Sequence, residues 1–204
     1  MTELPNGIYG ITSRDFGKTH VESAEMLLKA GIKIIQYREK NASTREMLRD
    51  AIDIRKICKE YGAIFIVNDR IDIAIASDAD GVHLGQEDMP IEIAKRMFPG
   101  KIIGISVSNI EETIEAQEKG ADYLGAGSIF PTETKKDSEV VGIDMLRDIM
   151  NVARIPVYAI GGITLENLDL IKRFKVRGAA VISAILNTEN PVETAKEFIR
   201  RWEK

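Results

Sequence analysis

Side chains suited to binding phosphate and metal ions follow several short apolar runs of this 204-residue sequence. Arg38 and Lys40 follow one run, Asp69 follows the next, and Asp88 comes soon after a third. A longer polar segment adds Lys135 and Lys136. Two carboxylates and substrate phosphates form the hard-oxygen environment that Mg²⁺ prefers, while Arg and Lys can hold the remaining phosphoryl oxygens. These residue types predict a cationic, magnesium-assisted phosphate site.

Other polar residues and glycines fall at comparable places. Gly161-Gly162 and Ser183 follow the last two apolar runs, where backbone N–H groups can bind a second phosphate. The remaining polar candidates are Gln36, Asn68, His83, Ser106, Thr132 and Thr134. The sequence thus favours two phosphate sites, one metal-assisted and cationic and the other built mainly from backbone.

Each of these residues also has an ordinary explanation. The two cations could pair with Glu39 or with nearby helix acids, and either aspartate could cap a helix. His83 alternates with apolar neighbours, a pattern typical of a structural histidine. The lysines and threonines of the long segment could belong to a solvated loop, although a loop of roughly fifteen residues in a compact domain is often functional. The functional interpretation is favoured because all of these groups map to the same ends of successive strands.

The elements that would position these residues alternate strictly between strand and helix. Most strand candidates are continuous apolar runs, as expected for strands covered on both faces. They occupy residues 8–12, 32–37, 63–67, 81–84, 102–107, 122–126, 156–160 and 179–183. This alternation predicts parallel strands and a single (β/α)₈ TIM barrel of class α/β over residues 1–204, with its site where strands end and helices begin. An open doubly wound sheet is the structural alternative.

Helix boundaries carry local signals of their own. Glycines after charged helix ends predict left-handed stops at Gly31, Gly62, Gly120 and Gly178. Capping-box spacing predicts helix starts at Thr19…Glu22, Ser43…Glu46 and Ser108…Glu111. The pattern therefore fixes many boundaries as well as the order of elements.

Composition narrows the class of protein. The net charge of −4 argues against a general nucleic-acid-binding surface, and no apolar run is long enough to cross a membrane. Cys58 is the one cysteine, which excludes an internal disulfide and fits a reducing cytoplasm. No signal peptide is visible, so we expect a cytoplasmic location. The oligomeric state stays open, a homo-oligomer included.

No nucleophile is evident from the motifs. There is no G-x-S-x-G elbow, and Cys58 falls within an expected helix. A reaction whose barrier falls by stabilising an anionic leaving group needs no protein nucleophile, because metal and cation electrostatics can carry it.

In five motifs the sequence resembles the thiamine phosphate synthase family, over nearly the whole chain. They are Gln36-Tyr37-Arg38-Glu39-Lys40, Val67-Asn68-Asp69, the stretch from Gly81 to Asp88, the loop from Pro131 to Asp137, and Ile160-Gly161-Gly162-Ile163 followed by Val181-Ile182-Ser183-Ala184. The first and fourth are highly specific, whereas Gly-Gly-Ile alone is not. The resemblance implies an enzyme that joins hydroxymethylpyrimidine diphosphate to hydroxyethylthiazole phosphate. Pyrophosphate would leave first, and the thiazole nitrogen would capture the pyrimidine cation.

The resemblance also implies roles for individual residues. Gln36 would contact the pyrimidine, with His83 nearby in a less defined role. The diphosphate would be held by Arg38, Lys40, Asn68, Ser106 and Lys135, of which Arg38, Ser106 and Lys135 are the expected catalytic residues. Asp69 and Asp88 would ligate Mg²⁺. The thiazole phosphate would contact Thr132, Thr134, Gly162, Ile182 and Ser183.

Two alternatives accompany this interpretation. A thiazole tautomerase-like enzyme of the same superfamily would share the barrel and the thiazole phosphate site without needing a diphosphate site. A non-catalytic barrel that binds a phosphate ligand would not need Mg²⁺. Retention of Arg38, Lys40, Asp69, Asp88 and Lys135 argues for the synthase.

Overall fold

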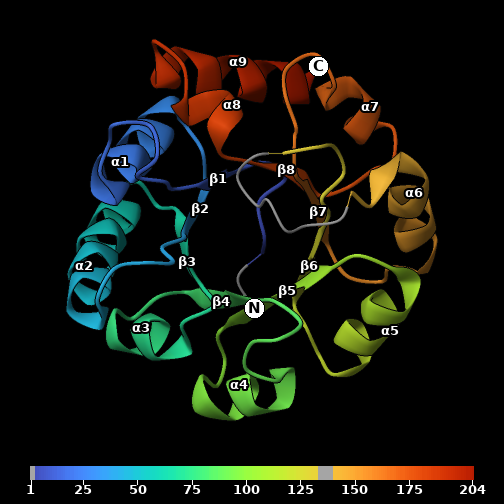
Figure 1. Cartoon of the computed structure of the whole chain (residues 1–204), viewed down its shortest axis with the longest axis horizontal. Helices are drawn as coiled ribbons and strands as arrows, with labels where there is room; N and C mark the ends of the chain where they lie inside the picture. Colours follow the sequence, from blue (N-terminus) through green and yellow to red (C-terminus); the bar gives the residue numbers. More distant parts are fainter. Residues whose placement is uncertain (1–2, 133–139) are drawn as a thin grey trace.

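The computed structural model describes residues 3–132 and 140–204, and in this part of the chain eight parallel strands close into a barrel (Figure 1). The strands are β1 (Gly7–Ile11), β2 (Ile34–Tyr37), β3 (Ile64–Asn68), β4 (Gly81–Leu84), β5 (Ile102–Val107), β6 (Tyr123–Ala126), β7 (Val157–Ile160) and β8 (Gly178–Val181). Each strand pairs with the next, and β8 pairs with β1 from Gly7↔Gly178 to Gly10↔Val181. Because the sheet closes on itself, the open-sheet alternative is excluded and the predicted barrel is confirmed.

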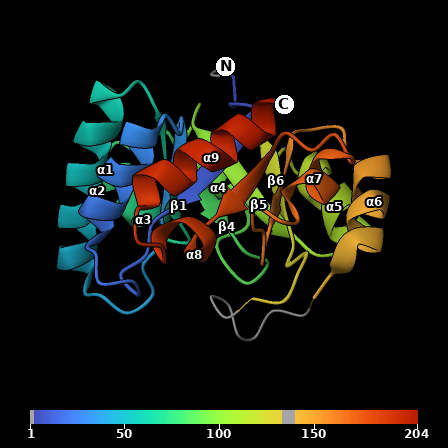
Figure 2. The same ribbon diagram turned by 90° about the horizontal axis from the view of Figure 1, so that it is seen from above.

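Helices surround the barrel as an outer layer (Figures 1 and 2). They are α1 (His20–Ala30), α2 (Thr44–Glu60), α3 (Ile71–Ala76), α4 (Ile91–Met97), α5 (Ile110–Glu118), α6 (Gly142–Val152), α7 (Leu168–Lys172), α8 (Ser183–Leu186) and α9 (Pro191–Glu203). Figure 2 shows α9 in front of the barrel, and α9 packs against both α1 and β1. No helix in the described ranges is long and apolar enough to cross a bilayer.

Alternation along each strand divides the buried residues into two layers. On β2, Ile34 and Gln36 face the barrel interior, whereas Ile35 and Tyr37 pack under the helices. The interior layer is built around Tyr9, Tyr123 and Tyr158, whose rings meet edge to face. Burying large aromatic rings supplies much of the hydrophobic stabilisation of such a core.

A glycine makes room for one of these rings. A Cβ at Gly104 on β5 would lie 2.1 Å from Cζ of Tyr123 on the adjacent strand. Only a residue without a side chain lets the Tyr123 ring lie across β5. The interior is therefore filled by a few large side chains facing small ones.

Most of the predicted helix signals are confirmed. Thr19 and Ser43 form complete capping boxes with Glu22 and Glu46. Gly31, Gly62 and Gly120 all adopt positive φ angles after their helices, as helix-ending glycines do. These local signals thus placed helix ends correctly where one side chain or one glycine decides the geometry.

Two of the predicted helix boundaries are wrong. The capping box at Ser108…Glu111 is displaced by one residue, because the Asn109 side chain accepts the Glu112 N–H at 2.8 Å. The Glu112 carboxylate in turn accepts from the Ser108 backbone N–H at 2.7 Å.

Gly178 does not stop a helix but begins β8, and Lys175 has the positive φ of 56° before it. A Cβ at Gly178 would lie 2.1 Å from the Gly7 carbonyl oxygen, so this glycine serves strand pairing.

Candidate functional site

One cavity of about 830 Å³ lies at the carboxyl ends of the barrel strands. Every predicted site residue within the described ranges lines it: Gln36, Arg38, Lys40, Asn68, Asp69, His83, Asp88, Ser106, Thr132, Gly162, Ile182 and Ser183. Thr134 and Lys135, with the neighbouring Lys136, lie outside the described residues. The parallel barrel brings together groups that are as many as 147 positions apart in the sequence, from Gln36 to Ser183.

The two aspartates form a carboxylate pair. Asp69 follows β3 with a left-handed φ of 58°, and its backbone N–H donates to the His83 carbonyl at 2.8 Å. The Asp88 carboxylate accepts the Gly85 N–H at 2.7 Å. The pKa of Asp88 is raised, chiefly by burial and further by the Asp69 carboxyl, while the Gly85 hydrogen bond opposes the rise.

Neither aspartate caps a helix. The residues preceding α3 and α4 are Arg70 and Pro90, and neither helix has a side-chain cap bond. Two close carboxylates repel each other unless a cation lies between or beside them. In the structure that cation is Lys40, whose ammonium contacts Asp69.

The carboxylate pair fits a magnesium ion. Asp69 and Asp88 offer hard oxygen ligands on a cavity large enough for a phosphorylated substrate. The described residues contain no cluster of three or more His, Cys, Asp or Glu side chains arranged to hold a metal. Mg²⁺ commonly uses one or two carboxylates and completes its coordination with substrate phosphates and water.

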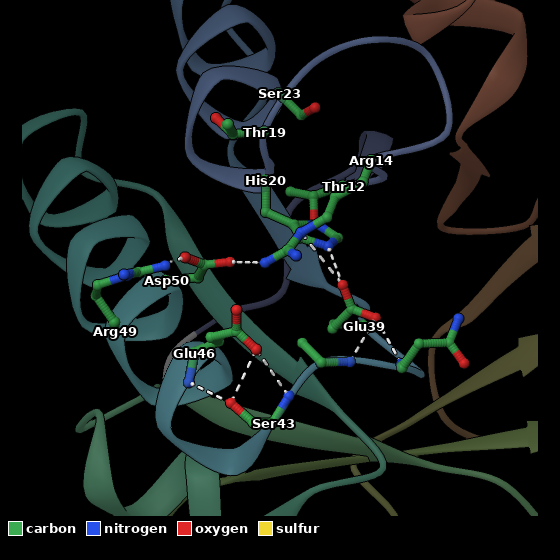
Figure 3. A network of polar contacts seen from close by, with 12 residues as sticks. Thr12, Arg14, Thr19, His20, Ser23, Glu39, Ser43, Glu46, Arg49 and Asp50 are labelled. Carbon is green, nitrogen blue, oxygen red and sulfur yellow. Dashed lines mark hydrogen bonds and ion pairs between the residues drawn. The ribbon is translucent and has the colours of Figure 1, made fainter.

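The segment between Arg38 and Lys40 is anchored by the residue between them. Glu39 does not pair with either neighbour, as one alternative supposed, but turns inward to His20 and Arg14 (Figure 3). His20 Nε2 lies 3.1 Å from the Glu39 carboxylate, and His20 Nδ1 lies 2.8 Å from the Thr12 hydroxyl. The same Thr12 hydroxyl accepts the Arg38 backbone N–H at 3.4 Å.

A second set of contacts completes this anchor. The Glu39 carboxylate accepts the Asn41 N–H at 2.6 Å, and Arg14 joins it to Asp50 of α2 through a 2.6 Å contact. Burial opposes ionisation of Glu39, but the hydrogen bonds from Asn41 and His20 outweigh it and lower its pKa to about 2. Burial in turn lowers the pKa of His20. The backbone that carries Arg38 and Lys40 is therefore fixed by the segment after β1 and by α1 and α2.

A chain of hydrogen-bonded side chains connects the cavity-lining residues Gln36, His83 and Ser106 through two buried tyrosines. Gln36 Nε2 donates to the Tyr9 hydroxyl at 3.0 Å, and the Tyr9 and Tyr123 hydroxyls are 2.9 Å apart. Tyr123 lies 2.9 Å from His83 Nδ1, and His83 Nε2 lies 2.9 Å from the Ser106 hydroxyl. His83 is thus held structurally and also faces the cavity.

The opposite side of the cavity is built from backbone. Gly161 and Gly162 have φ angles of 98° and 62°, which L side chains rarely adopt. Asn167 fixes this turn by donating to the Gly162 carbonyl at 2.9 Å. Ser183 was predicted to end the last strand, but β8 ends at Val181 and Ser183 is the first residue of α8. Its N–H lies at the start of the short helix because Ile182 already turns away from the strand, with φ −123° and ψ −87°.

Sequence reasoning missed Tyr9, Tyr123, His20 and the inward turn of Glu39. The tyrosines looked like ordinary core residues, and Tyr9 and Tyr123 meet across 114 positions of sequence. Their register offers the only signal, since each lies on the interior face of a strand that carries no other hydroxyl there. His20 and Glu39 gave no sequence signal, because their contact depends on how the segment after β2 folds onto the start of α1.

Comparison with known proteins identifies the family. The family model described as thiamine monophosphate synthase matches residues 8–185. The thiamine-phosphate synthase of Caldivirga maquilingensis is 52% identical over 202 residues, covering 98% of each chain. That of Pyrococcus horikoshii is 54% identical over 194 residues, covering 95% of this chain and 93% of the other.

A solved structure gives the same result. Thiamine phosphate pyrophosphorylase from Pyrococcus furiosus superposes with a TM-score of 0.92 at 48% identity, covering 97% of this chain and 95% of the other. The match of fold, sequence and family over nearly the full length leaves one conclusion. The chain belongs to the thiamine monophosphate synthase family, as an enzyme that forms thiamine phosphate with release of pyrophosphate.

Proposed function

We propose that the enzyme joins 4-amino-2-methyl-5-hydroxymethylpyrimidine diphosphate to 4-methyl-5-(2-hydroxyethyl)thiazole phosphate by a dissociative displacement. The bond between the pyrimidine methylene carbon and the diphosphate oxygen breaks first, and its electron pair leaves with pyrophosphate. The thiazole nitrogen then donates its lone pair to the methylene carbon, forming the new C–N bond. The ring nitrogen becomes positively charged, and no proton has to be transferred for the balance.

The observation that carries this proposal is the asymmetry of the cavity at the strand ends. Arg38, Lys40 and the carboxylate pair lie on one side, and the Gly162 turn and Ser183 line the same cavity. A departing diphosphate needs concentrated positive charge, since charge develops on it in the transition state. A phosphate that stays bound through the reaction needs only a fixed cradle of N–H groups.

Each group of residues has a role in this scheme. Arg38, Lys40, Asn68, Ser106 and Lys135 hold the diphosphate, and Gln36 orients the pyrimidine beside His83. The residues Thr132, Thr134, Gly162, Ile182 and Ser183 hold the thiazole phosphate. Mg²⁺ held by Asp69 and Asp88 supplies charge neutralisation to the leaving group when it is bound. The protein needs no nucleophile, and the buried Cys58, whose pKa burial raises to about 12, does not serve as one.

The test is to mix both substrates with Mg²⁺ and measure thiamine phosphate and pyrophosphate. Equal amounts of the two products should form, and a chelator should abolish both. Omitting the thiazole phosphate separates the alternatives. Only an enzyme that cleaves the diphosphate can then release pyrophosphate, slowly, with water in place of the thiazole. Thiazole turnover without any pyrophosphate would contradict the proposal and favour a tautomerase-like activity.

We further propose a cytoplasmic location. The single thiol has no second cysteine to pair with and lies on the buried face of α2, as suits a reducing compartment. A homo-oligomer stays a prediction, which analytical ultracentrifugation can measure.

A further inference from the structure

The chain of hydrogen-bonded side chains from Gln36 to Ser106 has a direction, which follows from counting its protons. Tyr9 and Tyr123 are almost fully buried, so a hydroxyl proton without an acceptor there would be costly. Each tyrosine has one proton to donate and an oxygen that can accept. The contacts at both ends of the chain decide which way these protons point.

The direction is set at Gln36. Its amide nitrogen can only donate, and it donates to the Tyr9 oxygen at 3.0 Å. The proton of Tyr9 then has one acceptor among the contacts of that hydroxyl, which is the Tyr123 oxygen at 2.9 Å. Tyr123 has accepted this proton, so its own proton goes to His83 Nδ1 at 2.9 Å.

The direction continues through His83 to Ser106. A neutral imidazole that accepts at Nδ1 carries its proton at Nε2, and this proton is donated to the Ser106 oxygen at 2.9 Å. The Ser106 hydroxyl is then left with its proton to donate into the cavity that it lines. An anion in the cavity would receive that proton as a hydrogen bond.

The opposite amide orientation would reverse every link. If the Gln36 oxygen faced Tyr9, Tyr9 would donate to it, Tyr123 to Tyr9, and His83 Nδ1 to Tyr123. Ser106 would then donate to His83 Nε2 and present only lone pairs to the cavity. The orientation of one amide thus decides whether the hydroxyl four hydrogen bonds away attracts or repels an anion.

We propose that Tyr9 and Tyr123 are positioning residues that transmit the orientation of the Gln36 amide to the Ser106 proton. This inference rests on the proposed function, in which Gln36 meets the pyrimidine and Ser106 meets the diphosphate. With its nitrogen turned to Tyr9, the Gln36 amide offers its oxygen to the cavity. A heterocycle with an exocyclic amino group donates to that oxygen, holds the amide in place and so keeps Ser106 as a donor to the leaving group. Recognition of the amino group and stabilisation of the departing anion are therefore coupled.

Nitrogen-15 NMR of histidine-labelled protein tests the direction without any substrate. The sequence contains two histidines, so the spectrum has two imidazoles, and a His83→Asn variant assigns them. We expect His83 with its proton on Nε2 and a hydrogen-bonded, unprotonated Nδ1. His20, which is bound to Thr12 and Glu39, provides an internal reference that should stay constant in the tyrosine variants. A His83 proton on Nδ1, or on both nitrogens, overturns the proposal.

Three Tyr→Phe variants test the transmission. Tyr158 is the matched control, because its ring belongs to the same buried cluster. Its hydroxyl donates to the Pro5 carbonyl and takes no part in the hydrogen bonds between Gln36 and Ser106. Tyr9→Phe and Tyr123→Phe should lower kcat about tenfold, the effect of one lost hydrogen bond, with the KM for thiazole phosphate unchanged. Tyr123→Phe should also shift the His83 Nδ1 signal. Tyr158→Phe should lower only the thermal stability, and equal kinetic effects of all three variants would reduce the tyrosines to packing.

A change at the far end of the chain provides the most direct test. Gln36→Glu replaces the donor by an acceptor, so at alkaline pH, where the new carboxylate is ionised, the His83 proton should move from Nε2 to Nδ1. A His83 signal that does not change shows that position 36 does not control the chain and contradicts the inference. Because this measurement uses ligand-free protein, it is independent of whether the two proposed substrates react.

Discussion

Lys40 contacts the carboxylate of Asp69 across the ends of two adjacent strands, where it lies beside a second carboxylate, Asp88. The lysine therefore occupies the charge-balancing role that a divalent ion would take when the substrate is bound. The lysine side chain is flexible, so its ammonium can move from the carboxylate to a phosphoryl oxygen of the substrate. On the proposed function, this ion pair would be the arrangement of the diphosphate site before substrate binds.

Replacing Lys40 should have two opposite effects. Lys40→Met removes the competitor for Asp69, so we expect Mg²⁺ alone to bind several-fold more tightly. The same variant loses a phosphate contact, so inorganic pyrophosphate with Mg²⁺ should bind about tenfold more weakly. Calorimetric titration of each ligand measures both. A loss of affinity for both ligands would show that the lysine supports the metal site instead of competing for it.

The magnesium requirement should depend on Asp69. Asp69→Asn retains the shape but loses the charge, so the Mg²⁺ concentration for half-maximal rate should rise at least tenfold. Asp72→Asn is the matched control, because Asp72 pairs with Arg70 and is absent from the cavity lining. A metal titration identical to that of the unchanged enzyme would remove Asp69 from the site.

Lys135 should be the residue whose loss affects chemistry most. In the proposed mechanism Lys135 holds the departing diphosphate, so we expect Lys135→Ala to lower kcat by about two to three orders of magnitude. Rapid-quench measurement of pyrophosphate in a single turnover isolates the bond-breaking step. Near-normal release would exclude the lysine from the mechanism.

Glu39 should give the protein part of its stability toward acid. Its pKa is lowered to about 2 in the folded protein, from an ordinary 4.5. A lowered carboxylate pKa stabilises the fold above the unfolded value, and this stabilisation is lost as the pH falls from about 4.5 through about 2. Glu39→Gln should therefore flatten the fall in unfolding free energy across this window, as chemical denaturation at successive pH values measures.

Asp78 offers a comparison for Glu39. Its pKa is also lowered to about 2, by Lys101 and Lys59, but its side chain is 64% exposed, against 8% for Glu39. Salt screens exposed pairs far more than buried ones. In about 1 M salt, the effect of Asp78→Asn on the unfolding free energy should thus vanish, whereas the effect of Glu39→Gln should persist. If both vanish, the anchor of Figure 3 is open to solvent.

The Gly162 turn should affect one substrate and spare the other. A Cβ at Gly162 would lie 2.5 Å from the Pro131 carbonyl oxygen, in a backbone with φ 62°. Gly162→Ala should raise the KM for thiazole phosphate about tenfold or more and leave pyrophosphate binding unchanged. Equal losses for both ligands would show that the turn supports the whole rim.

The sequence was sufficient for the fold and for many of the polar residues that line the cavity. Strand ends of a parallel barrel meet on one rim, so the positions of Asp69, Asp88 and Ser183 after apolar runs implied their proximity without any contact being known. Strand limits are predicted less well than strand order. The predicted bounds of β4 (Gly81–Leu84) and β5 (Ile102–Val107) agree with the structure, whereas the first strand starts and ends one residue earlier than predicted. Hydrogen bonding to the neighbouring strand, which the apolar run does not reveal, decides where each strand stops.

Contacts between side chains were beyond the sequence. That Tyr9 meets Tyr123 depends on the curvature of the barrel, and that Glu39 turns inward depends on N–H groups of its own loop. Both sets of contacts form only after distant segments of the chain have packed together. Patterns of residue type therefore identified polar groups that line the cavity but not the side chains that hold those groups in place.

Gly104 and the three tyrosines fill the centre of the barrel, and two of these tyrosines also hold the cavity-lining Gln36 and His83. Deepening the pocket to admit a bulkier heterocycle would remove rings on which the barrel depends for its packing. Enzymes of altered specificity should accordingly be sought by changing the rim loops, whose replacement leaves the barrel interior intact.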